Sequence, residues 1–153
     1  NASGIATLLA AAAHFAALAR RLAETRLPVW IVGSAKDAPI GAEIERLSGD
    51  TVRNLCGRTG LDQAIDLLSV AAVVVSNDSG LMHVAAALQR PLVALYGSSS
   101  PAYTPPLSRQ ARILSLGIEC SPCFQRECPL GHFKCLNDLT PGHVFDAMKG
   151  MHE

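Results

Sequence analysis

Two apolar runs, 71–76 and 91–96, flank a stretch with helical character at 81–88. Neither run alternates with polar residues, which is typical of strands that are buried on both faces of a parallel sheet. Two such strands separated by one helix form a β-α-β unit with a right-handed crossover. This stretch predicts a parallel sheet, and it constrains the fold more than any other part of the chain.

Further elements repeat the order of strand and helix on either side of this unit. The other expected strands are 28–32, 51–55 and 111–116, and the other expected helices are 5–24, 40–47, 61–70 and a last one from about 141. Thr140 and Pro141 indicate the start of the last helix, because threonine caps helices and proline favours their first turn. We therefore expect residues 1–153 to form one Rossmann-like α/β domain with an open, doubly wound parallel sheet.

Composition excludes several classes of protein. Hydrophobic residues make up 49% of the chain and charged residues 17%, which favours a well-packed core over disorder. The 13 basic and 13 acidic side chains cancel, so we expect no nucleic-acid partner. The alanine-rich run at 5–19 is too short to span a bilayer, so any membrane contact is expected to be peripheral.

The loop at 77–80 joins the first buried strand to the next helix. Open parallel sheets bind ligands beyond the carboxyl ends of their strands, and a helix start there favours a phosphate or diphosphate. Gly80 would let the backbone approach such a ligand, Ser79 offers a cap and a hydroxyl, and His83 lies one turn inside the helix. Asp78 would repel an anion, so we expect it to cap the helix or to accept a hydrogen bond. A purely structural interpretation, helix caps and a half-buried histidine, fits these residues equally well.

The sequence around this loop resembles a known family. The runs at 75–87 and 95–101 are similar to the signature of the heptosyltransferase family of glycosyltransferases. In that family Asp-(Ser/Thr)-Gly, a His three residues on, and a Tyr-Gly-x-(Thr/Ser) loop recur. The Cys-Gly-Arg-Thr-Gly-Leu sequence at 56–61 also fits, and the resemblance covers about 30–148.

The resemblance implies one half of a GT-B fold, in which two Rossmann-like halves face a cleft. It implies that the chain is the C-terminal, donor-binding half of an enzyme that transfers heptose from ADP-heptose to the lipopolysaccharide inner core. Such transfer needs no metal ion and inverts the anomeric carbon. Family members work at the cytoplasmic face of the inner membrane, so we expect a cytoplasmic location with peripheral membrane contact. The acceptor and the catalytic base belong to the other half, so we expect no catalytic residue here and no transfer by this chain alone.

The resemblance also assigns donor-binding roles to particular residues. Ser79 and His83 would hold the diphosphate, with Asp78 near the sugar, and Thr59 falls where the family lines the adenine pocket. One departure is that the family has a lysine in a Lys-x-Trp-Pro-like stretch where this chain has alanines at 10–13. The complete expected set is Asp78, Ser79, Gly80, His83, Thr59, Ser98 and Ser99.

Four of the five cysteines lie in one cysteine-rich segment, 120–135, which resembles the C-terminal segment of the heptosyltransferase II branch of the family. Four thiolates are the number that a structural zinc needs, but zinc motifs usually pair two Cys-x-x-Cys knuckles and this segment has one. Reduced thiols, a structural zinc and a disulfide all remain open. We favour reduced thiols and expect no cofactor. The four cysteines are Cys120, Cys123, Cys128 and Cys135.

Two other functions fit parts of the sequence. Another GT-B sugar-nucleotide enzyme, such as a different transferase or an epimerase, would share the fold but leave the cysteine-rich segment unexplained. A zinc-stabilised interaction module without enzyme activity would explain the cysteines, and it would bind stoichiometric metal but no nucleotide. Binding of ADP, of UDP or GDP, or of metal alone therefore discriminates among the three functions.

Overall fold

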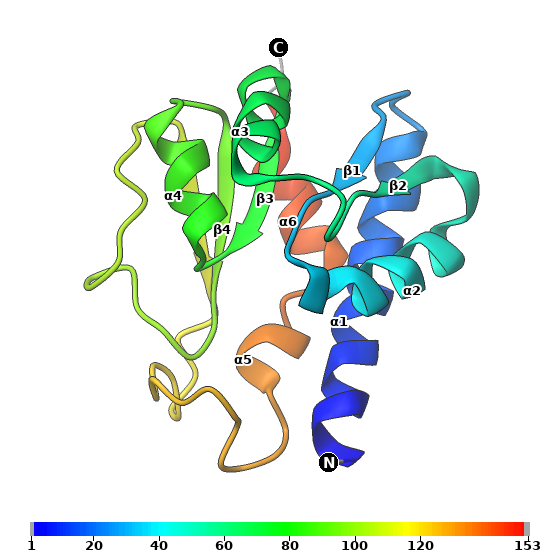
Figure 1. The fold of residues 1–153 in the computed structure, drawn as a ribbon. Helices are drawn as coiled ribbons and strands as arrows, with labels where there is room; N and C mark the ends of the chain where they lie inside the picture. The colour runs from blue at the N-terminus through cyan, green and yellow to red at the C-terminus, as the bar shows by residue number, and fades with distance from the viewer. Residues whose placement is uncertain (1, 152–153) are drawn as a thin grey trace. The chain divides into compact units, whose positions relative to one another are not determined.

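The computed structural model describes residues 2–151, and within the first helix it describes side chains from Ala12 onward. The alanines at 10 and 11, where the family has its lysine-containing stretch, lie outside the described side chains. The chain divides within one helix into two compact units, 1–64 and 65–153 (Figure 1). Each unit has its own parallel sheet.

The first unit contains two helices and a two-stranded sheet. Its elements are α1 (Ala2–Ala23), β1 (Val29–Ile31), the 3-10 turn η1 (Ala35–Asp37), α2 (Ala38–Ser48), the 3-10 turn η2 (Gly49–Thr51) and β2 (Val52–Asn54). The two helices pack on each other, and Ala12, Ala16 and Ile44 are buried together in one cluster. Small side chains at such a contact allow helices to approach closely. No helix in the described part of the chain has the length and apolar character needed to cross a membrane.

Asn54, the last residue of β2, ties three segments of the first unit together. Its amide nitrogen donates to the Ala38 carbonyl at 3.1 Å, and its amide oxygen accepts from the Cys56 N–H at 3.0 Å. Gly41 of α2 provides the space for this amide, because a Cβ at Gly41 would lie 2.3 Å from Asn54 Oδ1. The close approach of the helix to the end of the strand therefore requires glycine at position 41.

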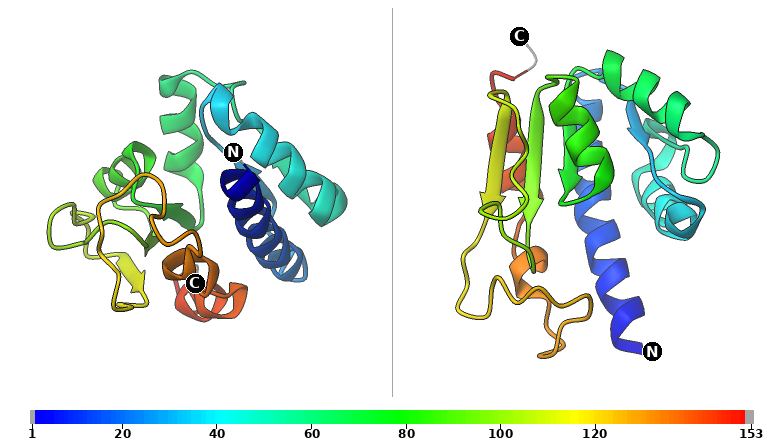
Figure 2. Two further views of the ribbon diagram at one scale, coloured as in Figure 1. Left: turned by 90° about the horizontal axis from the view of Figure 1, so that it is seen from below. Right: turned by 60° about the vertical axis from the view of Figure 1, so that its left-hand side comes forward.

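The second unit is a three-stranded parallel sheet with a helix on each face (Figures 1 and 2). The elements from the division onward are α3 (Leu61–Val70), in which the division falls, β3 (Val74–Asn77), α4 (Gly80–Ala87), β4 (Leu92–Tyr96), β5 (Ala111–Ser115), α5 (Lys134–Asn137) and α6 (Pro141–Met148). The strand order is β3-β4-β5. Figure 2 shows α4 on one face of this sheet and α6 on the other, and both helices contact β4.

The central strand β4 is buried along its whole length and forms the middle of the second core. Tyr96, Met82 and Leu92 are among the largest fully buried side chains. Full burial of an apolar side chain of this size stabilises a fold by about 1.5–3 kcal/mol. The core of the second unit therefore fixes β4 most firmly, and the loop that follows β4 starts from a rigid point.

Most of the predicted elements are present, with two differences. The helix at 61–70 has the predicted bounds, and Thr140 caps α6 by accepting a hydrogen bond from the His143 N–H. The described strands form two hydrogen-bonded ladders instead of the single open sheet that we expected, because β1 pairs with β2 while β3 pairs with β4. The short helix α5 was not predicted, since four residues carry too little periodicity to be recognised. A single donor-binding domain over 1–153 stays a prediction.

Gly41→Ala is expected to destabilise the chain by about 1–3 kcal/mol, because the new methyl group displaces the Asn54 amide and breaks its two hydrogen bonds. This loss should exceed the gain of about 1 kcal/mol in helix propensity. Urea denaturation measures the difference. The matched control is Gly41→Ala in an Asn54→Ala background, where the collision is absent and the substitution should be neutral or stabilising. Equal losses in the two backgrounds would contradict this account.

Candidate functional site

The candidate site lies at the carboxyl ends of β3 and β4. The parallel register pairs Asn77 with Leu95, and the next N–H, that of Asp78, donates to the Leu95 carbonyl at 3.2 Å. The loop after β3 and the loop after β4 therefore leave the sheet next to each other. Parallel α/β sheets bind their ligands at this edge.

Ser79 is the N-cap of α4. Its backbone is extended, with φ −156° and ψ 167°, and its Oγ accepts from the Met82 N–H at 3.4 Å. The Oγ of Ser76, a residue to which sequence analysis gave no role, lies 3.1 Å from Ser79 Oγ. The first N–H groups of a helix have no partner within the helix. Apart from the two chain neighbours of Gly80 and the backbone of α4 itself, no described atom lies within 4 Å of the position that a Cβ on Gly80 would occupy. The start of α4 thus offers donors and space to an anion.

Asp78 and His83 lie close to each other at the start of α4. His83 Nε2 is 3.9 Å from Asp78 Oδ1, an ion pair when the imidazole is protonated. The other carboxylate oxygen, Oδ2, accepts from Thr104 Oγ1 at 2.9 Å. The side chain of His83 is 45% exposed and that of Asp78 is 19% exposed, so the imidazole is the more accessible of the two. Asp78 is therefore held by neighbours, whereas His83 can reach a ligand.

Tyr96 connects this pair to the core. Its buried hydroxyl donates to the Thr104 carbonyl and lies 3.5 Å from the Met82 sulfur. Burial raises the pKa of Tyr96, and the charge of Asp78 raises it further. The hydroxyl is therefore a hydrogen-bond donor at neutral pH. Sequence analysis missed Thr104, because it lies 26 residues from Asp78 and no periodic pattern connects the two.

The loop after β4 is held by the cysteine-rich segment and by α5. Ser121 Oγ donates to the Gly97 carbonyl, and the Phe124 N–H donates to the Ser98 carbonyl at 2.7 Å. Leu136 of α5 packs against Gly97, where a Cβ would lie 2.5 Å from Leu136 Cγ. These contacts fix the main chain at the beginning of the loop.

A family model described as glycosyltransferase family 9 (heptosyltransferase) matches residues 11–134. The chain belongs to glycosyltransferase family 9. It is 44% identical over 142 residues to lipopolysaccharide heptosyltransferase 2 of Escherichia coli K12, a match that covers 90% of this chain and 41% of the relative. It is 50% identical over 141 residues to lipooligosaccharide heptosyltransferase 2 of Haemophilus influenzae, covering 88% of this chain and 40% of the relative.

The fold agrees with that of a solved family 9 structure. The structure of E. coli ADP-heptose LPS heptosyltransferase II matches with a TM-score of 0.80 at 43% identity, over 92% of this chain and 40% of the other. This match confirms the predicted fold class, a Rossmann-like half of a GT-B glycosyltransferase. The resemblance to heptosyltransferase II is confirmed as well. The chain spans about 40% of the length of these relatives.

Six of the seven residues predicted to bind the donor in this family 9 chain lie in the second unit, at one edge of its sheet. The six are Asp78, Ser79, Gly80, His83, Ser98 and Ser99. Thr59 lies in the first unit, in the loop that joins β2 to α3. In that loop Gly57 has a φ of +70° and donates its N–H to the Gly33 carbonyl at 3.0 Å. Sequence analysis gave both Asp78 and Ser79 as possible N-caps of this helix, and the structure has Ser79 as the N-cap. The donor-binding roles of the seven residues stay predictions.

No disulfide joins the five cysteines of this family 9 chain in the structure, and the pKa values of Cys128 and Cys135 shift in opposite directions. Burial raises the pKa of Cys135, and the charges of the other three thiols of the segment raise it further. Backbone N–H groups, chiefly that of Phe133, lower the pKa of Cys128. Among the described residues no group of three His, Cys, Asp or Glu side chains is arranged to hold a metal ion. Reduced thiols without a cofactor stay our prediction.

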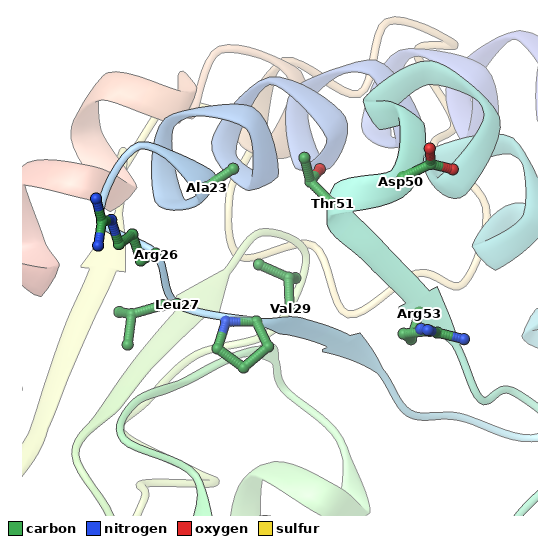
Figure 3. A pocket seen from close by; sticks show the side chains of 8 residues that line it. Ala23, Arg26, Leu27, Val29, Asp50, Thr51 and Arg53 are labelled. Carbon is green, nitrogen blue, oxygen red and sulfur yellow. The ribbon is translucent and has the colours of Figure 1, made fainter.

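A hollow of about 290 Å³ lies in the first unit, at the amino ends of β1 and β2 (Figure 3). It is lined by Ala23, Arg26, Leu27, Pro28, Val29, Asp50, Thr51 and Arg53. Ligands of parallel sheets bind at the opposite, carboxyl ends of the strands. The candidate ligand-binding site is therefore the sheet edge that carries Asp78 and Ser79, and not this hollow.

Cys128 is expected to be alkylated several-fold faster than Cys135 by iodoacetamide at pH 7. The thiolate is the reactive species, and its fraction is larger at Cys128, where N–H groups lower the pKa, than at the more buried Cys135. Mass spectrometry of peptides from a time course measures both rates. Urea should remove the difference, because it removes both environments. Faster reaction of Cys135 in the folded chain would show that this assignment is wrong.

Proposed function

We propose that this chain is the donor-binding half of a heptosyltransferase that transfers heptose from ADP-heptose to the inner core of lipopolysaccharide. One observation carries the proposal: the Ser79-capped start of α4, with Asp78 and His83 3.9 Å apart, lies at the ligand-binding edge of a parallel sheet in a family 9 chain. The names of the relatives supply the chemistry, since they are called heptosyltransferases and the solved one is called an ADP-heptose enzyme. Transfer is metal-independent and inverting.

The start of α4 binds the diphosphate in this proposal. As the bond between the sugar and ADP breaks, negative charge develops on the departing phosphate oxygen. Free N–H groups at Gly80 and Leu81 and an N–H of the His83 imidazole stabilise that charge, which is the general means by which preorganised donors accelerate such reactions. The positive end of the helix dipole adds to this effect.

The sugar then lies beside the Asp78 carboxylate, and the diphosphate lies at the N–H groups of the helix start. A carboxylate repels phosphate and cannot donate to it, so the ligand groups that suit Asp78 are hydroxyls. Ser98 and Ser99 follow β4 at the same sheet edge and approach the donor from the neighbouring loop. Thr59 approaches the adenine. The donor is thus bound with its phosphates on the helix and its heptose beside the carboxylate.

The remaining functions belong to the rest of the enzyme in this proposal. The acceptor and the catalytic base lie in the other GT-B half, so this chain binds the donor but does not transfer the sugar by itself. The enzyme works in the cytoplasm, with peripheral contact to the inner membrane where its lipid-linked acceptor is made. No nucleic acid is a partner, and no described feature favours a different sugar-nucleotide enzyme or a zinc-stabilised interaction module.

The test is calorimetric titration of the folded chain with ADP, UDP and GDP. We expect preference for ADP. His83→Ala should weaken ADP binding by about 10- to 150-fold, because a hydrogen bond to a charged group contributes about 1.5–3 kcal/mol. The control is His143→Ala, which removes another exposed histidine of the same unit and should leave the affinity for ADP unchanged. Preference for UDP or GDP would support another GT-B enzyme, and stoichiometric zinc binding without nucleotide binding would support the interaction module.

A further inference from the structure

Thr104 controls the orientation of the Asp78 carboxylate. Its Oγ1 donates to Asp78 Oδ2 at 2.9 Å, while Asp78 Oδ1 lies 3.9 Å from His83 Nε2. The terminal torsion of an aspartate is broad, so an unheld carboxylate samples many orientations. The bond from Thr104 selects one of them and gives the two carboxylate oxygens different surroundings.

The core anchors Thr104 in this position. The Tyr96 hydroxyl, which is buried at the end of β4, donates to the Thr104 carbonyl. The Thr104 N–H donates to the Ser100 carbonyl at 3.2 Å, which closes a turn in the loop. A hydroxyl inside the core therefore determines where the Thr104 side chain lies, although Thr104 itself is exposed.

The cysteine-rich segment supplies a second anchor. The rings of Phe124 and Tyr103, the residue before Thr104, pack edge to face with their centres 5.3 Å apart. The Phe124 N–H also donates to the Ser98 carbonyl at 2.7 Å. Phe124 is thus attached to both ends of the short stretch from Ser98 to Thr104, because it contacts Ser98 at one end and Tyr103 near the other. The cysteine-rich segment therefore supports the loop that carries Thr104, and it does so through Phe124 and not through its thiols.

We propose that Thr104 is a positioning residue that aims Asp78 at the sugar of the bound nucleotide-sugar. This inference rests on the proposed function and deepens it. The start of α4 binds the nucleoside diphosphate, whereas Asp78, held in place by Thr104, recognises the hydroxyl groups of the sugar. The two parts of the donor are therefore recognised by groups that can be changed separately.

Thr104→Val tests the inference, because it removes the hydroxyl and keeps the shape of the side chain. Calorimetry of the chain with ADP-heptose and with ADP should show the affinity for ADP-heptose falling roughly five- to tenfold, as expected when one hydrogen bond of ordinary net strength is lost. The affinity for ADP should change less than about twofold, since ADP has no sugar beyond its ribose. Thr104→Ser keeps the hydroxyl and should restore sugar binding. Thr25→Val, which removes a hydroxyl that donates to the Leu22 carbonyl in the first unit, is the matched control.

Two further variants separate positioning from a general effect on the fold. In an Asp78→Ala background Thr104→Val should change nothing more, because the partner of its hydroxyl is absent. Tyr96→Phe removes the hydrogen bond that anchors Thr104 and keeps the Thr104 hydroxyl. It should therefore lower the affinity for ADP-heptose less than Thr104→Val does, again with little change in the affinity for ADP. This variant replaces Thr104→Val if the latter does not fold, as judged from its NMR spectrum.

The outcomes distinguish this inference from the proposed function. Equal losses for ADP and ADP-heptose, or unchanged binding of ADP-heptose, would overturn the positioning role while the proposed function stands. An additional loss from Thr104→Val in the Asp78→Ala background would also overturn it. If the unaltered chain prefers UDP or GDP to ADP, the proposed function fails and the positioning role fails with it.

Discussion

The hydrogen-bonded pairing of β3 with β4 brings the loop of Asp78 beside the loop that contains Thr104. Most of β4 is apolar on both faces, so its aliphatic side chains alone would suit either orientation of the strand. Tyr96 removes this ambiguity, because a buried tyrosine hydroxyl needs a partner and this one has the Thr104 carbonyl. A shift of one residue in the pairing would turn the Tyr96 ring to the other face of the sheet and separate the two loops.

Features that depend on neighbours within about four positions could be predicted from the sequence. Ser79 and Thr140 cap their helices as expected. The hydrogen bond from Thr104 to Asp78 could not be predicted, because Thr104 lies 26 positions after Asp78, in a loop that contains no regular element. The division of the strands into two ladders was missed for a similar reason, since strand pairing is a long-range choice that short apolar runs do not encode.

The charges at the start of α4 form a consistent arrangement. A carboxylate about 4 Å from a phosphate would be opposed by about 4 kcal/mol at an effective dielectric constant of about 20. An aspartate at the start of a helix that binds diphosphate therefore needs compensation. The imidazole of His83 lies on one side of Asp78 and the hydroxyl of Thr104 holds the other. Under the proposed function, this arrangement lets a site for a diphosphate contain an acidic residue that recognises hydroxyl groups.

The attachment of the β4 loop to the cysteine-rich segment uses main-chain atoms of the loop. The Gly97 and Ser98 carbonyls accept the two hydrogen bonds, and the side chain of Ser98 takes no part in them. The path of the loop is therefore uncoupled from the identity of the side chain at position 98. Evolution can exchange that side chain to suit a different donor while the loop keeps its course, whereas Gly97 cannot change without moving Leu136.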